Sequence, residues 1–238
     1  MKDDQKFIVT RHTTLERLSH YVNILSLFAL LASGFVVYLG LPYMSYNQAF
    51  AIHVISAAIF VSINWVVIPY NAFVNRSLLS YMIWPKDLKM LLQVFKNFLS
   101  GSEYPRYTQY DLKKKRFRNR LHPLAKVLLH THYLALLIST LTGLVLYSTS
   151  LNLPGLNISG LIIRLLDVFT PSFALSAMGL ARLLHLAAAY WFVAEVVIHV
   201  GMIQLDPKKF QHIKSMFIDG KEDLNDDETA EILNDPYD

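Results

Sequence analysis

Cysteine is absent from the 238 residues of this chain. The absence excludes disulfides, thiolate-bound iron–sulfur clusters and c-type haem attachment within the chain. Charge is also scarce: 17% of the residues are charged and 53% are hydrophobic, which is more apolar than an ordinary soluble domain. If the protein handles electrons, its cofactor must be held by ligands other than thiolates, and nine histidines are the candidates.

The apolar residues are gathered into blocks that are each long enough to cross ~30 Å of hydrocarbon as a helix. The predicted spans are residues 19–41, 49–70, 126–148 and 180–205. The fold class is therefore predicted to be an all-α membrane protein, with a four-helix transmembrane bundle within residues 1–218. The first span follows a charged stretch without a small-residue cleavage site, so we do not expect a signal peptide.

Lysine and arginine are concentrated at both ends of the chain and in the connection between the second and third spans, which contains KKKRFRNR (113–120). The other two connections, 41–48 and 149–179, contain only two charged residues, Arg164 and Asp167. Because cytoplasmic loops are enriched in lysine and arginine, we expect both termini on the cytoplasmic side of the membrane. This topology explains the pI of about 9.1, so no nucleic acid partner is expected.

Three segments outside the spans have patterns of their own. WPKDLKMLLQVFKNFLSG (84–101) has apolar residues at helical spacing with lysines between them, which predicts an amphipathic helix on the membrane surface or against a partner. The segment 156–169 is similar and shorter. The acidic residues 219–238 are expected to form a solvated tail or a docking arm.

The spans repeat a pattern. The first and third begin with SHY and THY and end with SGFVVY (33–38) and TGLVLY (142–147). The second and fourth contain IHVISAAIFV (52–61) and LHLAAAYWFV (184–193). The pattern suggests a duplicated helical hairpin.

Four histidines fall at two depths of the predicted bundle. His185 and His199 are fourteen residues apart, so on a helix they lie about 21 Å apart and within roughly 40° of the same direction. The topology places His53 and His185 near the outer face, and His20 and His199 near the inner face. A pair of imidazoles from facing helices is the ligand set of a six-coordinate b-type haem, so the four histidines predict two haem b groups.

Other interpretations of these histidines stay open. His132 is the counterpart of His20 in the repeat, and either His132 or His130 could replace His20 as the partner of His199. A histidine in a membrane helix can also bridge helices by hydrogen bonds or take part in a proton path.

Several of these stretches together resemble a known family. RHTTLERLSHY, AIHVISAAIF, LHPLAKV…LTGLVLY, HLAAAYWFVAEVVIHVGM and IKSMFIDGK are similar, in this order over residues 11–221, to the di-haem cytochrome b subunit of membrane-bound formate dehydrogenases. They also resemble the b-type cytochromes of nickel–iron hydrogenases and thiosulfate reductases. The resemblance implies the haem pairs His20 with His199 and His53 with His185, and favours His20 over His132.

The resemblance also implies partners and a substrate. Such subunits exchange electrons with an iron–sulfur subunit near the outer haem, within a complex that contains a catalytic subunit, and with a quinone (menaquinone or similar) near the inner haem. Of the family's quinone motif before the third span, only Lys126 is kept; His122 lies where the family has other residues. The quinone-side candidates are His122, Lys126, His130, His132 and Glu195.

Arginines near the predicted haem levels are candidates for binding the anionic propionates. Arg11 and Arg17 lie near the inner level, and Arg182 lies one turn from His185 near the outer level. Each could instead be an interfacial residue whose charged end reaches toward the membrane surface.

Glu195 is the only acidic residue deep inside a predicted span, where an unpaired carboxylate is costly. It lies four residues before His199 and so on the same side of the helix. It could bond to Asn64 or deliver protons to the inner quinone site. Gly34 and Gly143 fall inside spans, where a missing side chain admits a close helix or a porphyrin face.

The sequence therefore favours a membrane cytochrome b subunit of a multi-subunit respiratory oxidoreductase. A self-standing b561-type di-haem quinone oxidoreductase is an alternative, because it would use the same histidine ligands. An alternative from another functional class is a haem-free membrane anchor or a transporter subunit with a proton path.

Overall fold

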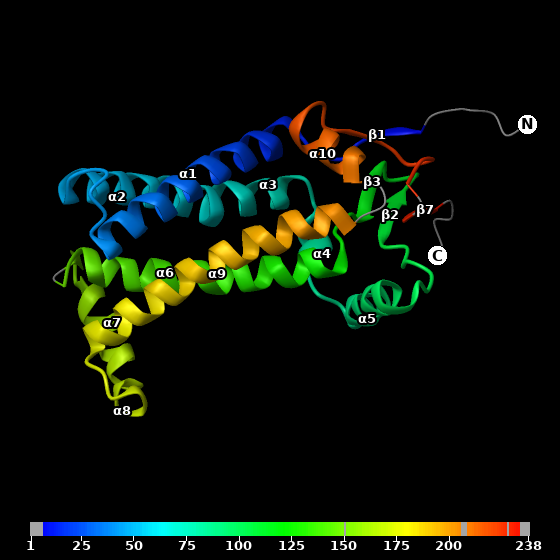
Figure 1. Cartoon of the computed structure of the whole chain (residues 1–238). Helices are drawn as coiled ribbons and strands as arrows, with labels where there is room; N and C mark the ends of the chain where they lie inside the picture. The colour runs from blue at the N-terminus through cyan, green and yellow to red at the C-terminus, as the bar shows by residue number, and fades with distance from the viewer. Residues whose placement is uncertain (1–6, 150, 206–208, 228, 234–238) are drawn as a thin grey trace, which may run out of the picture. The chain divides into compact units, whose positions relative to one another are not determined.

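The computed structural model describes residues 7–149, 151–205, 209–227 and 229–233. Within these ranges the chain is mostly helical, and four helices are long and apolar enough to cross a membrane (Figure 1). Their bounds are Thr14–Leu39, Tyr46–Val74, Pro123–Tyr147 and Ala177–Met202. The predicted fold class, an all-α membrane protein with four spans, is confirmed.

The first span, α1 (Thr14–Leu39), begins earlier than the predicted residue 19. Thr13 and Glu16 form a capping box: the Thr13 hydroxyl accepts from the Glu16 N–H, and the Glu16 carboxylate accepts from the Thr13 N–H. The acidic side chain also suits the positive end of the helix dipole, so this charged turn is helical although it is not apolar. Gly40 ends the helix with a left-handed backbone, at φ 63°.

The second span is not a uniform α-helix. It runs through α2 (Tyr46–Ser62), the π-helical η1 (Ile63–Val67) and α3 (Ile68–Val74). Asn64 in η1 is buried, and its side-chain amide donates to the Phe60 carbonyl at 2.9 Å. A π-helical turn adds a residue to the span and turns the following residues to a different face.

The chain divides into two compact units. The first comprises the described residues up to 127 and those from 202 onward, and the second comprises residues 128–201. In the first unit, α1 and α2 form a helical hairpin joined by residues 40–45 (Figure 1).

The first unit also contains a small strand-rich part that the sequence did not predict. β1 (Ile8–Thr10) pairs antiparallel with β6 (Lys221–Asp223). β2 (Thr108–Asp111) pairs antiparallel with β3 (Arg116–Asn119) and parallel with β7 (Ala230–Leu233). Strands from both ends of the chain therefore meet the connection between the second and third spans.

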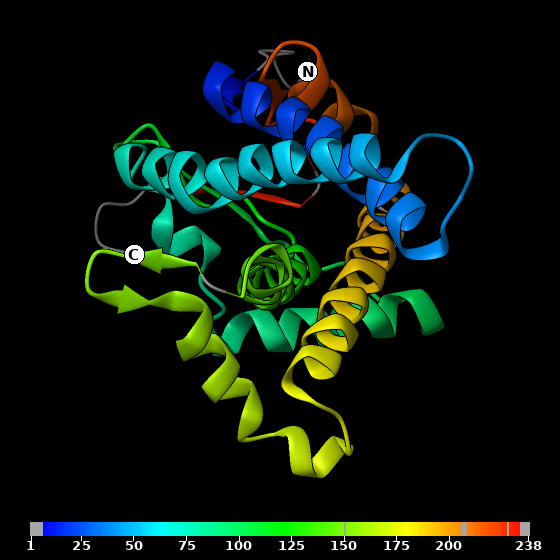
Figure 2. The ribbon, with the colours of Figure 1, turned by 90° about the vertical axis from the view of Figure 1, so that its left-hand side faces the viewer.

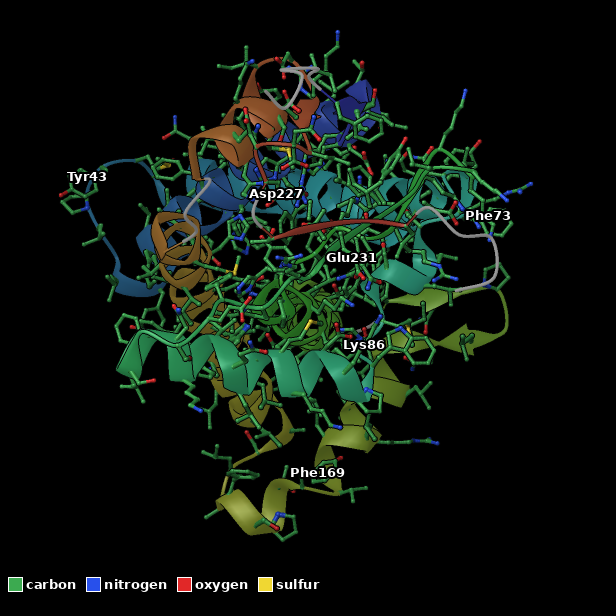
Figure 3. All side chains as sticks on the ribbon, turned by 90° about the vertical axis from the view of Figure 1, so that its right-hand side faces the viewer. Tyr43, Phe73, Lys86, Phe169, Asp227 and Glu231 are labelled. Atoms are coloured by element: carbon green, nitrogen blue, oxygen red, sulfur yellow. The ribbon has the colours of Figure 1, made fainter. Side chains whose placement is uncertain are left out.

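The expectation that residues 219–238 form a solvated tail is wrong for their described part. β6 and β7 pair with earlier strands, and Leu224 lies in a small core with Val9 and Tyr110. The acidic residue Glu222 is buried and forms an ion pair with Arg11, which neutralises its charge. Figure 3 shows the β7 strand in red, with Glu231 labelled.

Short helices complete the first unit: α4 (Leu78–Tyr81), α5 (Pro85–Ser100) and α10 (Lys209–Phe217). α5 confirms the helix predicted in 84–101, and Gly101 ends it with a φ of 64°. It has exposed apolar side chains, including Leu92. Lys86 lies at its start (Figure 3).

The second unit contains most of α6 and α9 and the chain between them. The elements are α6 (Pro123–Tyr147), β4 (Asn152–Leu153), β5 (Leu156–Asn157), α7 (Ile158–Asp167), α8 (Thr170–Phe173) and α9 (Ala177–Leu205). Figure 2 shows the short β4–β5 hairpin leading into α7. Buried apolar residues join α7 to the two long helices: Val145, Ile162, Leu166, Ala177, Leu180 and Ala181.

Candidate functional site

The imidazole of His53 is held by the neighbouring helix of its own unit. Its Nδ1 lies 3.1 Å from the Leu30 carbonyl oxygen and 3.3 Å from the Ser33 hydroxyl. The Ser33 hydroxyl itself donates to the Ala29 carbonyl at 2.6 Å. Both neighbours of Nδ1 are thus acceptors, so the proton of the neutral ring is assigned to Nδ1 and the lone pair to Nε2.

Gly34 makes room for this ring. A methyl group at Gly34 would lie 3.1 Å from Cε1 and 3.3 Å from Nδ1 of His53, which is closer than nearly all real contacts of this kind. The missing side chain therefore admits an imidazole, a third possibility beside the close helix and porphyrin face that the sequence suggested.

His185 faces a similar hydroxyl–glycine pair in the second unit. Its Nδ1 lies 3.0 Å from the Thr142 hydroxyl, and that hydroxyl donates to the Ile138 carbonyl at 2.7 Å. A methyl group at Gly143 would lie 3.3 Å from Cε1 of the ring. The same argument assigns the proton to Nδ1 and the lone pair to Nε2.

The repeat in the sequence thus corresponds to a repeated contact. Ser-Gly at 33–34 and Thr-Gly at 142–143 each face a histidine of the next span in their own unit. Sequence reasoning singled out both glycines and both histidines, but it missed the hydroxyl residues. The shared hydroxyl–glycine pair at the start of SGFVVY and TGLVLY was the signal that could have found them.

Glu195 bonds to a histidine of its own unit. Its two carboxylate oxygens lie 3.0 and 3.1 Å from Nδ1 of His132, and the ring of His132 packs edge-on against Phe192. A metal-bound histidine commonly donates its other N–H to a carboxylate or carbonyl. His132 therefore has the same kind of support as His53, and the alternative of His132 in place of His20 stays open.

Two histidine levels exist within the first unit. The residues that surround His53, from Leu30 to Gly34, lie ten to fourteen positions after His20 on α1, or roughly 15–21 Å along the helix. The ring of His20 instead packs 5.5 Å from that of Phe217.

The second unit also has two levels. Thr142, which contacts His185, lies ten positions after His132 on α6, or about 15 Å along the helix. On α9, the continuous helix separates His185 from His199 by the predicted distance of about 21 Å.

Two of the three predicted propionate arginines have other roles. Arg11 is buried, forms an ion pair with Glu222 and donates to the Arg120 carbonyl at 2.6 Å. Arg17 donates to carbonyl oxygens of residues 216 and 218. These arginines attach the strand-rich part and α10 to the start of α1, and their charge is directed at protein acceptors. A propionate role for these two arginines stays a prediction.

Two further site candidates on the long helices, Arg182 and His130, are exposed. Arg182 is exposed on α9, three residues before His185, and keeps the predicted position for a propionate. His130 is exposed on α6.

Lys126 forms a buried ion pair. Its Nζ lies 3.0 Å from both carboxylate oxygens of Asp87, and the two side chains are 1% and 2% exposed. This pair joins the start of α5 to the start of α6. The ammonium group of Lys126 is thus neutralised inside the protein, and its quinone-side role stays a prediction.

His122 is bonded at both ring nitrogens. Nδ1 accepts from the Leu124 N–H at 3.1 Å, so the proton is assigned to Nε2, which lies 2.7 Å from the Tyr104 hydroxyl. Both nitrogens are used within the chain, and the quinone-side role of His122 stays a prediction.

The histidine surroundings fit a haem iron. Iron is bound by a neutral imidazole through a nitrogen lone pair, and a hydrogen bond at the other nitrogen fixes the ring and its tautomer. His53 and His185 meet these conditions by contacts within their own units. Each of these two residues would therefore be able to hold a haem iron through Nε2.

Comparison with known proteins agrees with this chemistry. A cytochrome subunit of F420 non-reducing hydrogenase II from Methanosarcina mazei is 36% identical over 234 residues, which cover 94% of this chain and 87% of the relative. The similarity confirms the resemblance to hydrogenase b-type cytochromes. Residues 11–218 match the family described as prokaryotic cytochrome b561. The chain therefore belongs to the prokaryotic cytochrome b561 family.

Proposed function

We propose that this chain is the membrane cytochrome b subunit of a multi-subunit respiratory oxidoreductase. It passes electrons through two b haems between an iron–sulfur partner subunit and the membrane quinone pool. The proposal is supported mainly by the Nδ1 hydrogen bonds of His53 and His185, which present each ring as a ligand. Family membership adds that the chain is a b-type cytochrome.

The proposed ligand pairs are His53 with His185 at the outer level and His20 with His199 at the inner level. A haem held by such a pair of imidazoles would supply a one-electron couple and would leave no open iron site for a substrate. The depth of each histidine in its span supports the pairing. The chain's contribution is to hold each imidazole in its tautomer and orientation.

The proposed orientation puts both termini and the strand-rich part on the cytoplasmic side of the membrane. Lysine and arginine are abundant in that part, including the run 113–120, and scarce at the opposite ends of the spans. The inner haem level, with His20 and His199, then faces the cytoplasm.

The quinone, menaquinone or a similar one, reacts near the inner level. His132 and Glu195 form a hydrogen-bonded, protonable pair there, and Glu195 lies one turn from His199. Such a pair can hold a proton between the aqueous side and a quinone oxygen. The exposed His130 stays a quinone-side candidate.

The partners are an iron–sulfur subunit and a catalytic subunit of the same complex. The Methanosarcina mazei relative is the cytochrome subunit of a hydrogenase and matches this chain over nearly all its length. A cytochrome without a catalytic site depends on such a partner for electrons.

Spectra of single variants purified from membranes test the ligand assignment. We expect wild-type protein to show reduced b-haem absorption, and alanine at any of the four ligand positions to remove about half of the haem. The four positions are His20, His53, His185 and His199. His132→Ala is the matched control, because it removes an imidazole of α6 that is not assigned as a ligand.

Full haem content in His185→Ala would overturn the outer pair. Loss of haem in His132→Ala, with full content in His20→Ala, would transfer the inner ligand to His132. The alternative of a self-standing quinone oxidoreductase is tested by co-purification: quinone reduction by the isolated chain without an iron–sulfur subunit would favour it.

A further inference from the structure

We infer that Ser33 and Thr142 are positioning residues that set the reduction potential of the outer-level haem. The inference rests on the proposed ligand roles of His53 and His185 and goes beyond them, because it assigns a function to residues that do not touch the iron. Each hydroxyl accepts a hydrogen bond from Nδ1 of one ligand, at 3.3 Å and 3.0 Å respectively.

The direction of each hydrogen bond is determined by the helix that holds the hydroxyl. Ser33 donates its proton to the Ala29 carbonyl at 2.6 Å, and Thr142 donates to the Ile138 carbonyl at 2.7 Å. A hydroxyl has only one proton, so its oxygen must accept when it faces an imidazole nitrogen. A flexible hydroxyl that could reverse would not select one tautomer.

The glycines also constrain the imidazoles, by allowing close contact with the helix backbone. Gly34 and Gly143 let the imidazoles approach α1 and α6 so closely that an added methyl group would lie 3.1–3.3 Å from Cε1. The ring is thus held at Nδ1 by a hydrogen bond and at Cε1 by the helix backbone. Rotation about the Cβ–Cγ bond would break both contacts, so the plane of each ligand is determined by the chain.

A serine of the same helix shows that the histidine contact is specific. Ser26 lies seven residues before Ser33, is buried, and donates to the Val22 carbonyl at 2.7 Å in the same way. Among the described residues, its hydroxyl bonds only to carbonyls of its own helix. Ser26 therefore shares the local geometry of Ser33 but does not contact an imidazole.

The hydrogen bond has an electronic consequence. Donation from Nδ1 to an acceptor increases the basicity of the ligating nitrogen, as for other metal-bound histidines. A more basic ligand stabilises the ferric more than the ferrous state, which lowers the reduction potential. Both proposed ligands of the outer haem have this hydrogen bond. Removing either hydrogen bond should therefore raise the reduction potential of that haem.

Redox titration of Thr142→Val in the purified complex tests the inference. Valine keeps the shape of threonine and removes the acceptor, so we expect a rise in the midpoint potential of one haem, with the other unchanged. The low-spin ferric spectrum of the same haem should shift because its ligand plane is freer. Thr142→Ser restores the hydroxyl and should restore both signals.

The parallel change in the first unit is Ser33→Ala. It should raise the midpoint potential of the same haem. The rise should be smaller than for Thr142→Val, because the Leu30 carbonyl remains near Nδ1 of His53 as an acceptor. Ser26→Ala and Ser139→Ala are matched controls, because each removes a hydroxyl that bonds to a carbonyl of its own helix.

The outcomes separate this inference from the ligand assignment. Unchanged potential and ferric spectrum in Thr142→Val, with two haems bound, would overturn the positioning role while the ligands stand. Equal shifts of the midpoint potential in Ser139→Ala and Thr142→Val would also overturn the positioning role. The effect would then come from a general loosening of α6. Retention of both haems in His53→Ala and His185→Ala would instead overturn the proposed ligands.

Discussion

The ion pair of Asp87 and Lys126 gives the sharpest test of how the first unit is held together. The Lys126 ammonium lies 3.0 Å from both carboxylate oxygens, and both side chains are almost fully buried. Asp87→Asn removes the negative charge, and the amide oxygen can still accept the Trp84 N–H that Asp87 caps at 2.7 Å. The variant therefore isolates the loss of charge pairing from the loss of the cap.

The expected cost is large because a buried ammonium is left uncompensated. Breaking a buried pair from one side costs roughly 3–5 kcal/mol. At roughly 2–4 °C per kcal/mol for a domain of this size, the Tm should fall by about 6–20 °C. Thermal unfolding of the purified protein in detergent measures the shift.

The double variant Asp87→Asn/Lys126→Met is the control. It removes both charges, and replacing a whole buried pair by groups of similar volume is often nearly neutral, so most of the lost stability should return. A Tm of Asp87→Asn within about 1 °C of wild type would refute the reasoning, as would a double variant no more stable than the single one. If the stable double variant lost quinone reduction but kept haem reduction by its partner, Lys126 would belong to the quinone site after all.

Three further changes probe other parts of the chain. Gly34→Ala should push the ring of His53 by a few tenths of an ångström, because the new methyl group would lie 3.1 Å from Cε1; a visible spectrum identical to wild type would contradict the close approach. Burial, together with two neighbouring arginines, lowers the pKa of His12 from 6.5 to about 2, so below pH 6.5 only the unfolded state binds this proton and stability falls as the pH falls. Between pH 6.5 and pH 5, the free energy of unfolding of His12→Gln should therefore fall by roughly 1.6 kcal/mol less than that of wild type, as measured by denaturant unfolding at both pH values. Glu222→Gln should destabilise the strand-rich part by leaving a buried arginine without its anion, and hydrogen exchange that is unchanged in β1 and β6 would argue against this role.

The spans could be predicted from sequence because their signal is local. Each is a continuous apolar block, and only the ends differ, as at α1, where the capping box extends the helix through a charged turn. The spacing of His185 and His199 follows from helix geometry alone. The repeat of SGFVVY and TGLVLY likewise indicated two similar hairpins.

The roles of individual polar residues could not be predicted in this way, because they depend on which distant residue lies opposite. Arg11 was assigned to a propionate by its depth and Lys126 to the quinone by the family resemblance, and the structure pairs them with Glu222 and Asp87. Glu195 was located relative to His199, but its partner within the unit, His132, is 63 residues away.

The C-terminal segment shows the same limit. Its acidic composition is typical of a solvated tail, yet β6 and β7 pair with strands from the start and the middle of the chain. Backbone hydrogen bonds hold these strands in place, and the ion pair with Arg11 neutralises the buried Glu222. Neither kind of contact can be recognised from composition.

By itself the sequence determined the four spans, the repeated hairpin and the two histidine levels, since hydrophobic length and helical period are properties of each segment alone. Only the tertiary structure decided that Ser33 and Thr142 orient the histidines and that buried acids neutralise Arg11 and Lys126. These roles arise where two helices or strands meet, and a hydrogen bond or ion pair exists only once packing has brought both partners together.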